Sequence, residues 1–135
     1  FCMTDLQAAV GLAQFSKLPE IMRRKKRNRE HYEDALSSLP AISFQEAPDG
    51  YVDWFTNILL DKPENLALFL GKQGIQTRRF FYPLHKQPAY KHLKFGSFPT
   101  SSYLYDHGLS LPSSATLTPE DIDLVCQKIK LFFKN

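Results

Sequence analysis

Residues 118–133 read TPEDIDLVCQKIKLFF and form the clearest helical pattern in the chain. Thr118 is a favourable N-cap, and Pro119 suits the first helical position because its missing N–H would have no partner there. Acidic residues follow, and they complement the positive end of the helix dipole. Apolar residues recur along one side of this helix, at Ile122, Val125, Cys126, Ile129, Phe132 and Phe133. We expect this stripe to be part of the core.

Short extended segments and helices alternate in the preceding sequence. β-Branched, aromatic and leucine residues predict strands at 42–44, 52–60, 75–78 and 109–112. Helices are predicted at 63–74 and 99–107, with a short helix at 88–93 and a turn at Pro48-Asp49-Gly50. This order favours a single α/β domain over residues 1–135. We expect an α+β sandwich, in which helices cover one side of a short, mostly antiparallel sheet.

The start of the chain predicts a capped helix. Thr4 and Gln7 form a capping-box pattern, in which each side chain reaches the other residue's backbone N–H. Much of this helix is small, with Ala8, Ala9, Gly11 and Ala13. Two interpretations stay open: another backbone or a ligand comes close to it, or it lies in a tightly packed core.

A second helix is predicted to run to about residue 37. Pro19 removes a helical hydrogen bond, so we expect a kink or a new helix near residues 16–19, with Ser16 as the N-cap. The residues expected to be buried are Leu18, Met22, Tyr32, Ala35 and Leu36.

The second helix carries a basic run, RRKKRNR, at residues 23–29. Such a run can bind phosphate backbones. Helical geometry scatters these charges around the axis, however, and Lys26 can pair with Glu30 and Arg29 with Glu33 at the i,i+4 spacing. A solvated helix surface is therefore favoured over a nucleic-acid-binding helix.

Composition excludes several other classes. The net charge is +3, and no apolar run reaches the length of a membrane helix. The four histidines lack zinc-ligand spacing, so no metal site is expected. Cys2 and Cys126 can form a disulfide, but free thiols in a reducing cytoplasm are favoured.

Residues 78–90, RRFFYPLHKQPAY, are the best candidate for ligand binding. Arginine and histidine donors suit an anionic ligand such as a diphosphate, and aromatic faces suit a base or a sugar ring. Prolines lower the entropy cost of holding a loop in one shape. An aromatic loop packed under surface charges explains the same residues equally well.

Six segments of the chain form a pattern when they are taken in order: FCMTDLQAAVGLAQ (1–14), WFTNILLD (54–61), GIQTR (74–78), FYPLHKQP (81–88), GLSLPSS (108–114) and Leu117-Thr118. Together they resemble aminotransferases of the DegT/DnrJ/EryC1/StrS family. The resemblance covers essentially the whole chain, and it is greatest to the perosamine synthase-like subgroup.

The resemblance implies the C-terminal small domain of a fold type I aminotransferase, cut away from its large domain. It implies that the parent enzyme uses pyridoxal phosphate as its cofactor. It also implies that this enzyme is a cytoplasmic homodimer that acts in polysaccharide biosynthesis. Glutamate would donate the amino group to a 4-keto-6-deoxy sugar carried on a nucleotide diphosphate. In the family the aldimine lysine lies upstream, and Lys17, Lys72 and Lys86 do not match it. These 135 residues alone are therefore expected to be inactive, with no catalytic residue and no cofactor bound.

The resemblance also assigns substrate contacts. His85 matches a family histidine on the loop that faces the active-site cleft, and Arg78 and Tyr82 are further candidates for the same region. Cys2 stands where the family often has a basic residue, so the resemblance does not extend to a charge contact there. Arg79 stands where the family often has proline, so a less rigid loop is expected. The alternative is a non-catalytic domain for sugar-nucleotide binding or protein interaction.

Overall fold

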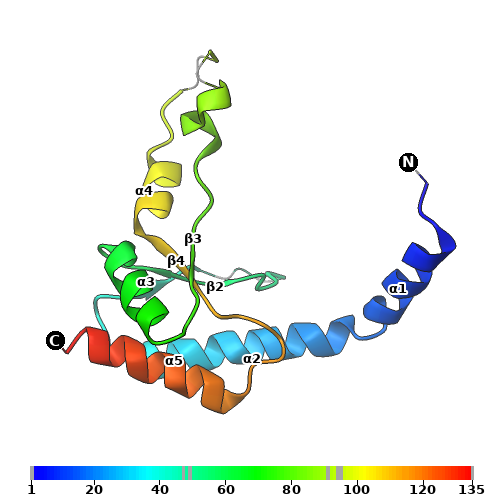
Figure 1. Cartoon of the computed structure of the whole chain (residues 1–135), viewed down its shortest axis with the longest axis horizontal. Helices are drawn as coiled ribbons and strands as arrows, with labels where there is room; N and C mark the ends of the chain where they lie inside the picture. Colours follow the sequence, from blue (N-terminus) through cyan, green and yellow to red (C-terminus); the bar gives the residue numbers. More distant parts are fainter. Residues whose placement is uncertain (1, 47, 49, 91, 94–95, 135) are drawn as a thin grey trace.

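The computed structural model describes residues 2–46, 48, 50–90, 92–93 and 96–134 (Figure 1). Among these described residues, five helices alternate irregularly with four short strands. The helices are α1 (Asp5–Phe15), α2 (Leu18–Leu36), α3 (Pro63–Lys72), α4 (Pro99–His107) and α5 (Pro119–Phe132). The strands are β1 (Ser43–Phe44), β2 (Thr56–Leu59), β3 (Arg78–Arg79) and β4 (Gly108–Leu111), and the 3-10 turns are η1 (Leu84–Lys86) and η2 (Pro88–Tyr90).

The four strands form one sheet in the order β1-β2-β4-β3, and every neighbouring pair is antiparallel. Ile58 of β2 faces Leu109 of β4, and Thr56 faces Leu111. Side chains alternate along a strand, so these four residues share one face, and all are buried. The intervening residues, Asn57 and Ser110, lie on the opposite face.

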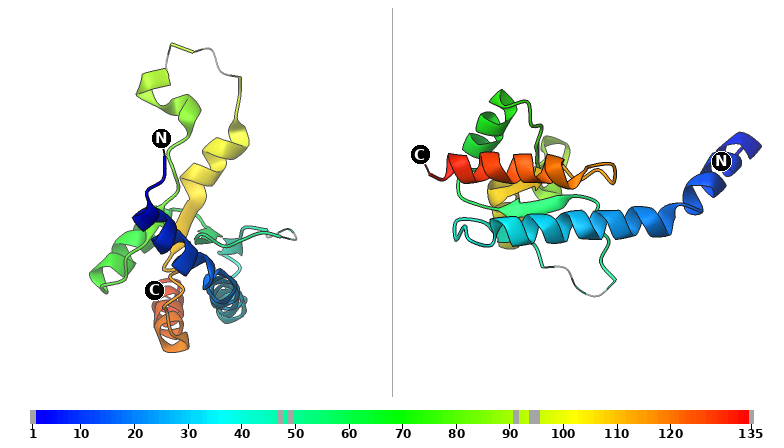
Figure 2. Two further views of the ribbon diagram at one scale, coloured as in Figure 1. Left: turned by 90° about the vertical axis from the view of Figure 1, so that its right-hand side faces the viewer. Right: turned by 90° about the horizontal axis from the view of Figure 1, so that it is seen from below.

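Three helices cover the apolar face of the sheet. Helices α2 and α5 run side by side beneath it, and α3 packs next to α5 (Figures 1 and 2). The buried core comes from these helices, from β2 and β4, and from the residues that follow β2 and α3: Tyr32, Leu36, Ile58, Leu60, Leu66, Leu70, Ile75, Leu109, Leu111, Ile122, Val125, Cys126 and Ile129. The predicted class, an antiparallel sheet covered on one side, is confirmed, and so is the core stripe of the last helix.

Helix ends follow the expected chemistry. Thr118 Oγ1 accepts from the Asp121 N–H, and the Asp121 carboxylate accepts from the Thr118 N–H. Gly74, with φ of 76°, ends α3: its N–H donates to Gly71 O and the Ile75 N–H to Leu70 O. This Schellman arrangement requires the left-handed conformation that glycine adopts freely.

Two strands differ from the prediction. Instead of 52–60, the strand spans only Thr56–Leu59, because the Asp53 side chain turns inward and the Trp54 carbonyl accepts from Lys25. Instead of 75–78, the strand is Arg78–Arg79, because Ile75 enters the core directly after the helix end.

The first helix also corrects a prediction. Helix α1 has the expected capping box of Thr4 and Gln7. None of its residues is buried within the described part of the chain, so the interpretation that it lies in a tightly packed core of this chain is wrong. It extends away from the body (Figure 1). The break before Pro19 is confirmed, but Lys17 precedes α2 and the Ser16 hydroxyl instead donates to Ala13 O.

Burial on α2 follows the prediction in part. Tyr32 and Leu36 are buried and Ala35 is partly buried, as expected, whereas Leu18 and Met22 are exposed because nothing in the described chain covers them. Phe1 of the family-like start, Asp49 of the expected turn and Lys91 of the expected short helix lie outside the described residues.

Acidic partners neutralise much of the basic run. Arg23 and Arg24 pair with Glu20, and Lys26 pairs with Glu30. Arg29 pairs with Glu33 at 2.8 Å, as predicted, but the side chain is buried rather than solvated. Across the described ranges, no helix is both long and apolar enough to cross a bilayer.

Candidate functional site

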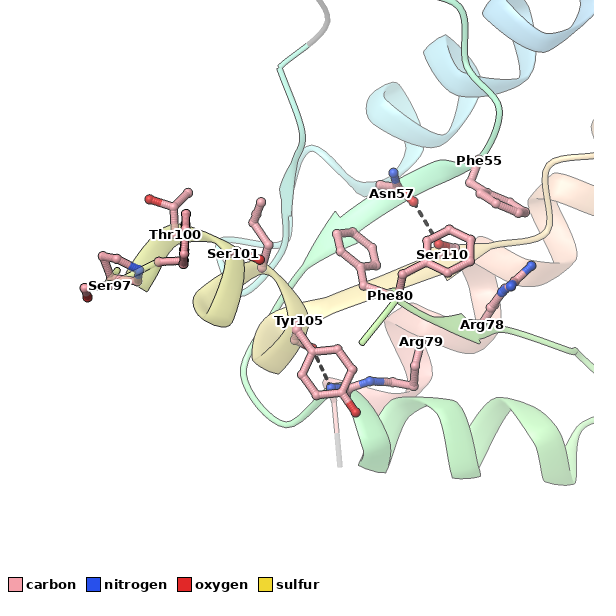
Figure 3. A pocket seen from close by; sticks show the side chains of 14 residues that line it. Phe55, Asn57, Arg78, Arg79, Phe80, Ser97, Thr100, Ser101, Tyr105 and Ser110 are labelled. Carbon is pink, nitrogen blue, oxygen red and sulfur yellow. Dashed lines mark hydrogen bonds between the residues drawn. The ribbon is translucent and has the colours of Figure 1, made fainter. Parts of the chain in front are cut away.

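The face of the sheet without helices α2, α3 and α5 carries a cavity of about 640 Å³ (Figure 3). At its base the Ser110 hydroxyl of β4 donates to Asn57 Oδ1 of β2, at 2.8 Å. Helix α4 forms one wall. The lining residues are Phe55, Asn57, Arg78, Arg79, Phe80, Phe81, Ser97, Phe98, Pro99, Thr100, Ser101, Leu104, Tyr105 and Ser110. The lining therefore combines aromatic and other apolar side chains with hydroxyl groups and two arginines.

Four side chains form what we call the Arg78 cluster: Trp54, Phe55, Arg78 and Phe81. The Arg78 guanidinium carbon lies 5.5 Å from the Phe55 ring centre and 4.7 Å from that of Phe81. Trp54 stacks on Phe55, with ring centres 4.6 Å apart, and lies 6.0 Å from Phe81. Within the described chain, no hydrogen bond or ion pair occupies the Arg78 guanidinium. Aromatic faces thus hold a cation whose donors remain available to an anion.

The two consecutive arginines of strand β3, Arg78 and Arg79, make different contacts because their side chains point to opposite faces of the sheet. Successive side chains of a strand point to opposite faces, and Figure 3 shows Arg78 and Arg79 directed away from each other. Arg79 forms an ion pair with Glu64 of α3 and donates to Tyr105 O at 2.7 Å. Arg79 therefore links β3 to α3 and α4, while Arg78 pairs with Ser110 and shares its face of the sheet.

The structure does not gather the three predicted contacts into one group. Arg78 lines the cavity, but Tyr82 and His85 do not. Tyr82 meets the Tyr105 ring edge-on, with centres 5.1 Å apart. His85 lies 3.5 Å from the Ser102 hydroxyl, through Nε2, and 5.0 Å from the Phe98 ring centre. Both therefore flank α4 beside the cavity wall.

Phe55, Asn57 and Ser110 line the site but were not predicted from the sequence. Two of them could have been found from the alternation of side chains along a strand: Asn57 follows Phe55 by two positions in a segment expected to be a strand, so the two side chains are expected on one face. The partner Ser110 could not be found in this way, because its pairing with β2 spans 53 residues of sequence.

A second cavity, of about 480 Å³, lies beside the first, and Arg78, Phe55 and Ser110 line both. Lys25 lines the second cavity, where its Nζ donates to Trp54 O at 2.8 Å and to Ser113 O at 2.9 Å. Burial lowers the pKa of Lys25, against the opposing effect of Asp53. Among the described residues that line the two cavities, none is acidic.

These residues fit an anionic ligand but not the complete site of pyridoxal phosphate. That cofactor needs a lysine for its carbonyl and a carboxylate for its ring nitrogen. The amine of Lys25 is bound to two carbonyls, and the lining of both cavities contains no carboxylate. This face alone therefore does not supply the set that holds the cofactor.

The thiols do not add a nucleophile or a disulfide to the site. Cys2 and Cys126 are free, as expected, and burial raises the pKa of Cys126 to about 11. In the part of the chain that the structure describes, no group of three or more histidine, cysteine or acidic side chains is placed to hold a metal ion.

Comparison with known proteins gives consistent matches. A profile described as the DegT/DnrJ/EryC1/StrS aminotransferase family matches residues 1–130. GDP-perosamine synthase of Vibrio cholerae is 34% identical over an alignment of 138 positions, which covers 97% of this chain and 38% of that protein. The chain thus spans well under half the length of this relative.

Solved structures agree. The aminotransferase TlmJ of Streptoalloteichus hindustanus matches with a TM-score of 0.88 and 26% identity, over 98% of this chain and 37% of its own. A DegT DnrJ EryC1 StrS aminotransferase of Brucella abortus matches with a TM-score of 0.84 and 31% identity, over 93% and 35%. Because the family profile covers nearly every residue and the fold agrees, the chain belongs to the DegT/DnrJ/EryC1/StrS aminotransferase family.

Proposed function

We propose that this chain is the C-terminal small domain of a pyridoxal phosphate-dependent sugar aminotransferase, and that its Arg78 cluster binds an anionic group of the nucleotide sugar. The observation that carries this proposal is the guanidinium of Arg78, which lies against the Phe55 and Phe81 rings with its donors unpaired. A diphosphate would accept from those donors, and a sugar or base would stack on the exposed rings. Tyr82 and His85, beside the same cavity wall, would contact parts of the substrate further out.

The names of the relatives support the substrate class. The protein from Vibrio cholerae and another from Escherichia coli O157:H7, 29% identical, are both GDP-perosamine synthases. We therefore propose a 4-keto-6-deoxy sugar on a nucleotide diphosphate as acceptor and glutamate as amino donor. When bound, pyridoxal phosphate supplies the electron sink for this transfer, and the rest of the parent polypeptide would hold it. The present residues would bind and orient the sugar nucleotide.

Helix α1 supports the view of a domain within a longer protein. It is apolar on several sides, and Leu6, Leu12 and Phe15 are each at least 70% exposed. A helix that is apolar all round is normally buried. The match to TlmJ covers 98% of this chain at a TM-score of 0.88 but only 37% of TlmJ. We propose that the remaining part of the parent polypeptide covers α1.

The test is an Arg78→Gln variant of the full-length parent, assayed for amino transfer from glutamate. A hydrogen-bonded ion pair contributes about 1.5–3 kcal/mol, so KM for the sugar nucleotide should rise about ten- to a hundred-fold. The matched control is Arg27→Gln, which removes an exposed arginine of α2, and it should leave KM unchanged. An unchanged KM in Arg78→Gln would show that this arginine does not contact the substrate.

A further inference from the structure

Helix α2 presents a row of donors to the loops that border the Arg78 cluster. Lys25, Asn28 and Tyr32 lie on one side of the helix, at spacings of three and four residues. Lys25 Nζ donates to Ser113 O at 2.9 Å, Asn28 Nδ2 to Ser114 O at 3.0 Å and the Tyr32 hydroxyl to Pro112 O at 3.0 Å. The three carbonyls belong to consecutive residues that follow β4. The row therefore fixes the backbone between β4 and α5 on α2.

Lys25 differs from the other two donors because it holds a second segment as well. Its Nζ also donates to Trp54 O at 2.8 Å, 29 residues away in the sequence. The Ser113 hydroxyl reaches the same carbonyl at 3.5 Å. One ammonium group thus joins the segment before β2 to the segment after β4, and the first of these carries Trp54 and Phe55.

We infer that Lys25 is a positioning residue, whose ammonium group holds Trp54 and Phe55 in the arrangement that places the Phe55 ring against Arg78. Residues 52–55 have no strand pairing of their own, so the sheet does not fix them. Trp54 and Phe81 are exposed, so burial does not fix their rings either. The ion pair of Asp53 with Arg29 anchors the residue before Trp54, and the hydrogen bond from Lys25 Nζ is the shorter of the two contacts that hold the Trp54 carbonyl itself. The inference deepens the proposed function and rests on it for its consequence in catalysis, but the structural test below needs no ligand.

Trp54 provides the readout, because it is the only tryptophan in the chain. Its longest-wavelength band in the near-ultraviolet circular dichroism spectrum belongs to it alone and depends on fixed packing. In the 135-residue chain, Lys25→Met should lose most of this band while the far-ultraviolet spectrum keeps its helical signal. Lys25→Arg should restore the band, because a guanidinium can donate to both carbonyls.

Asn28→Ala is the matched control. Asn28 is buried and bonds to the same loop through Ser114 O, but it makes no bond to Trp54. This variant should melt earlier than the native chain yet keep the tryptophan band. Loss of the band in both variants, or its retention in Lys25→Met, would overturn the positioning role. If the methionine variant does not fold, Lys25→Leu, which also has no donor, takes its place, and an unweakened band there has the same meaning.

In the full-length parent, Lys25→Met should raise KM for the sugar nucleotide and leave kcat nearly unchanged. The two proposals fail in different ways. If Arg78→Gln leaves KM unchanged but Lys25→Met loses the tryptophan band, the positioning role of Lys25 is supported and the binding role of Arg78 is wrong. If Arg78→Gln raises KM but Lys25→Met keeps the band, the binding role stands alone.

Discussion

Arg29 is a charged side chain that the fold has taken almost completely out of water. It and its partner Asp53 are each 7% exposed, and Arg29 Nη1 lies 2.9 Å from Asp53 Oδ1. Glu33 and the Gln45 carbonyl accept from the same guanidinium. Burying two charges costs solvation free energy, and the pair offsets that cost only while both partners are present. The group fixes the segment around Asp53 on α2.

Asp53→Ala should therefore lower the free energy of unfolding by about 3 kcal/mol, because it leaves a buried guanidinium with one carboxylate fewer. Urea denaturation followed by circular dichroism measures the change. Glu30→Ala is the control, since it removes an exposed pair with Lys26 at 3.8 Å and should have little effect. Equal effects of the two substitutions would mean that the buried pair contributes no more than a surface pair.

Single residues were predictable where their partners are close in sequence. The pairs of Lys26 with Glu30 and of Arg29 with Glu33 follow from helical spacing, and both form. The burial of Arg29 could not be predicted, because Asp53 is 24 residues away and approaches only when the chain folds. For the same reason the pattern marked Arg78 as a binding candidate but did not show which rings would flank it.

At the scale of elements, two helices begin with the same capping box in different surroundings. Thr118 starts α5, which packs in the core, and Thr4 starts α1, which has no buried residue among those described. Each side chain accepts a hydrogen bond from the backbone of the third helical residue. Because the capping hydrogen bonds are of the same kind, removing each threonine in turn distinguishes the stability of a single helix from the stability of the whole fold.

Thr118→Ala should lower the global free energy of unfolding by about 1 kcal/mol, the usual contribution of such a cap. Thr4→Ala should instead speed amide hydrogen exchange in α1 and leave the global transition of this chain in place, because α1 unfolds locally. Urea denaturation and hydrogen exchange give the two readouts. A global loss of the same size in Thr4→Ala would show that α1 packs on the body.

Helices were predicted more accurately than strands. Caps, prolines and Gly74 are local signals, and they located α3, α4 and α5 to within about two residues. Strand ends depend on pairing between distant residues, so 52–60 shortened to Thr56–Leu59. The close approach of Phe80 to Gly108, where a side chain would also meet Leu104 O, had no sequence signal either.

At the scale of the molecule, the alternation of helices and short strands was enough to predict the class of fold. The sheet exposes one face, and the candidate site lies on that face beside α4 (Figure 3). Sequence pattern alone does not say which face stays open, because that depends on where α2, α3 and α5 pack together. The residue types of the 78–90 loop and the family resemblance both supplied the expectation of a ligand, and the geometry supplied Phe55, Asn57 and Ser110 around Arg78.

Helix α2 changes its surroundings along its length. Apolar residues are exposed on α1 and on the start of α2, while the opposite end of α2 is packed in the core (Figure 1). This difference agrees with the proposal that another part of a longer parent polypeptide covers α1. It also explains why Leu18 and Met22, which fit the apolar pattern of a covered helix, are exposed in this chain.

The most direct test of the account is amino transfer from glutamate to a nucleotide-linked 4-keto-6-deoxy sugar, measured side by side for the parent polypeptide and for the 135-residue chain. The parent should show the visible absorption of bound pyridoxal phosphate and form the amino sugar, whereas the chain alone should do neither. A parent that binds no cofactor and forms no amino sugar would contradict the proposal of an aminotransferase. Amino transfer by the chain alone would contradict the assignment of the cofactor site to the rest of the protein.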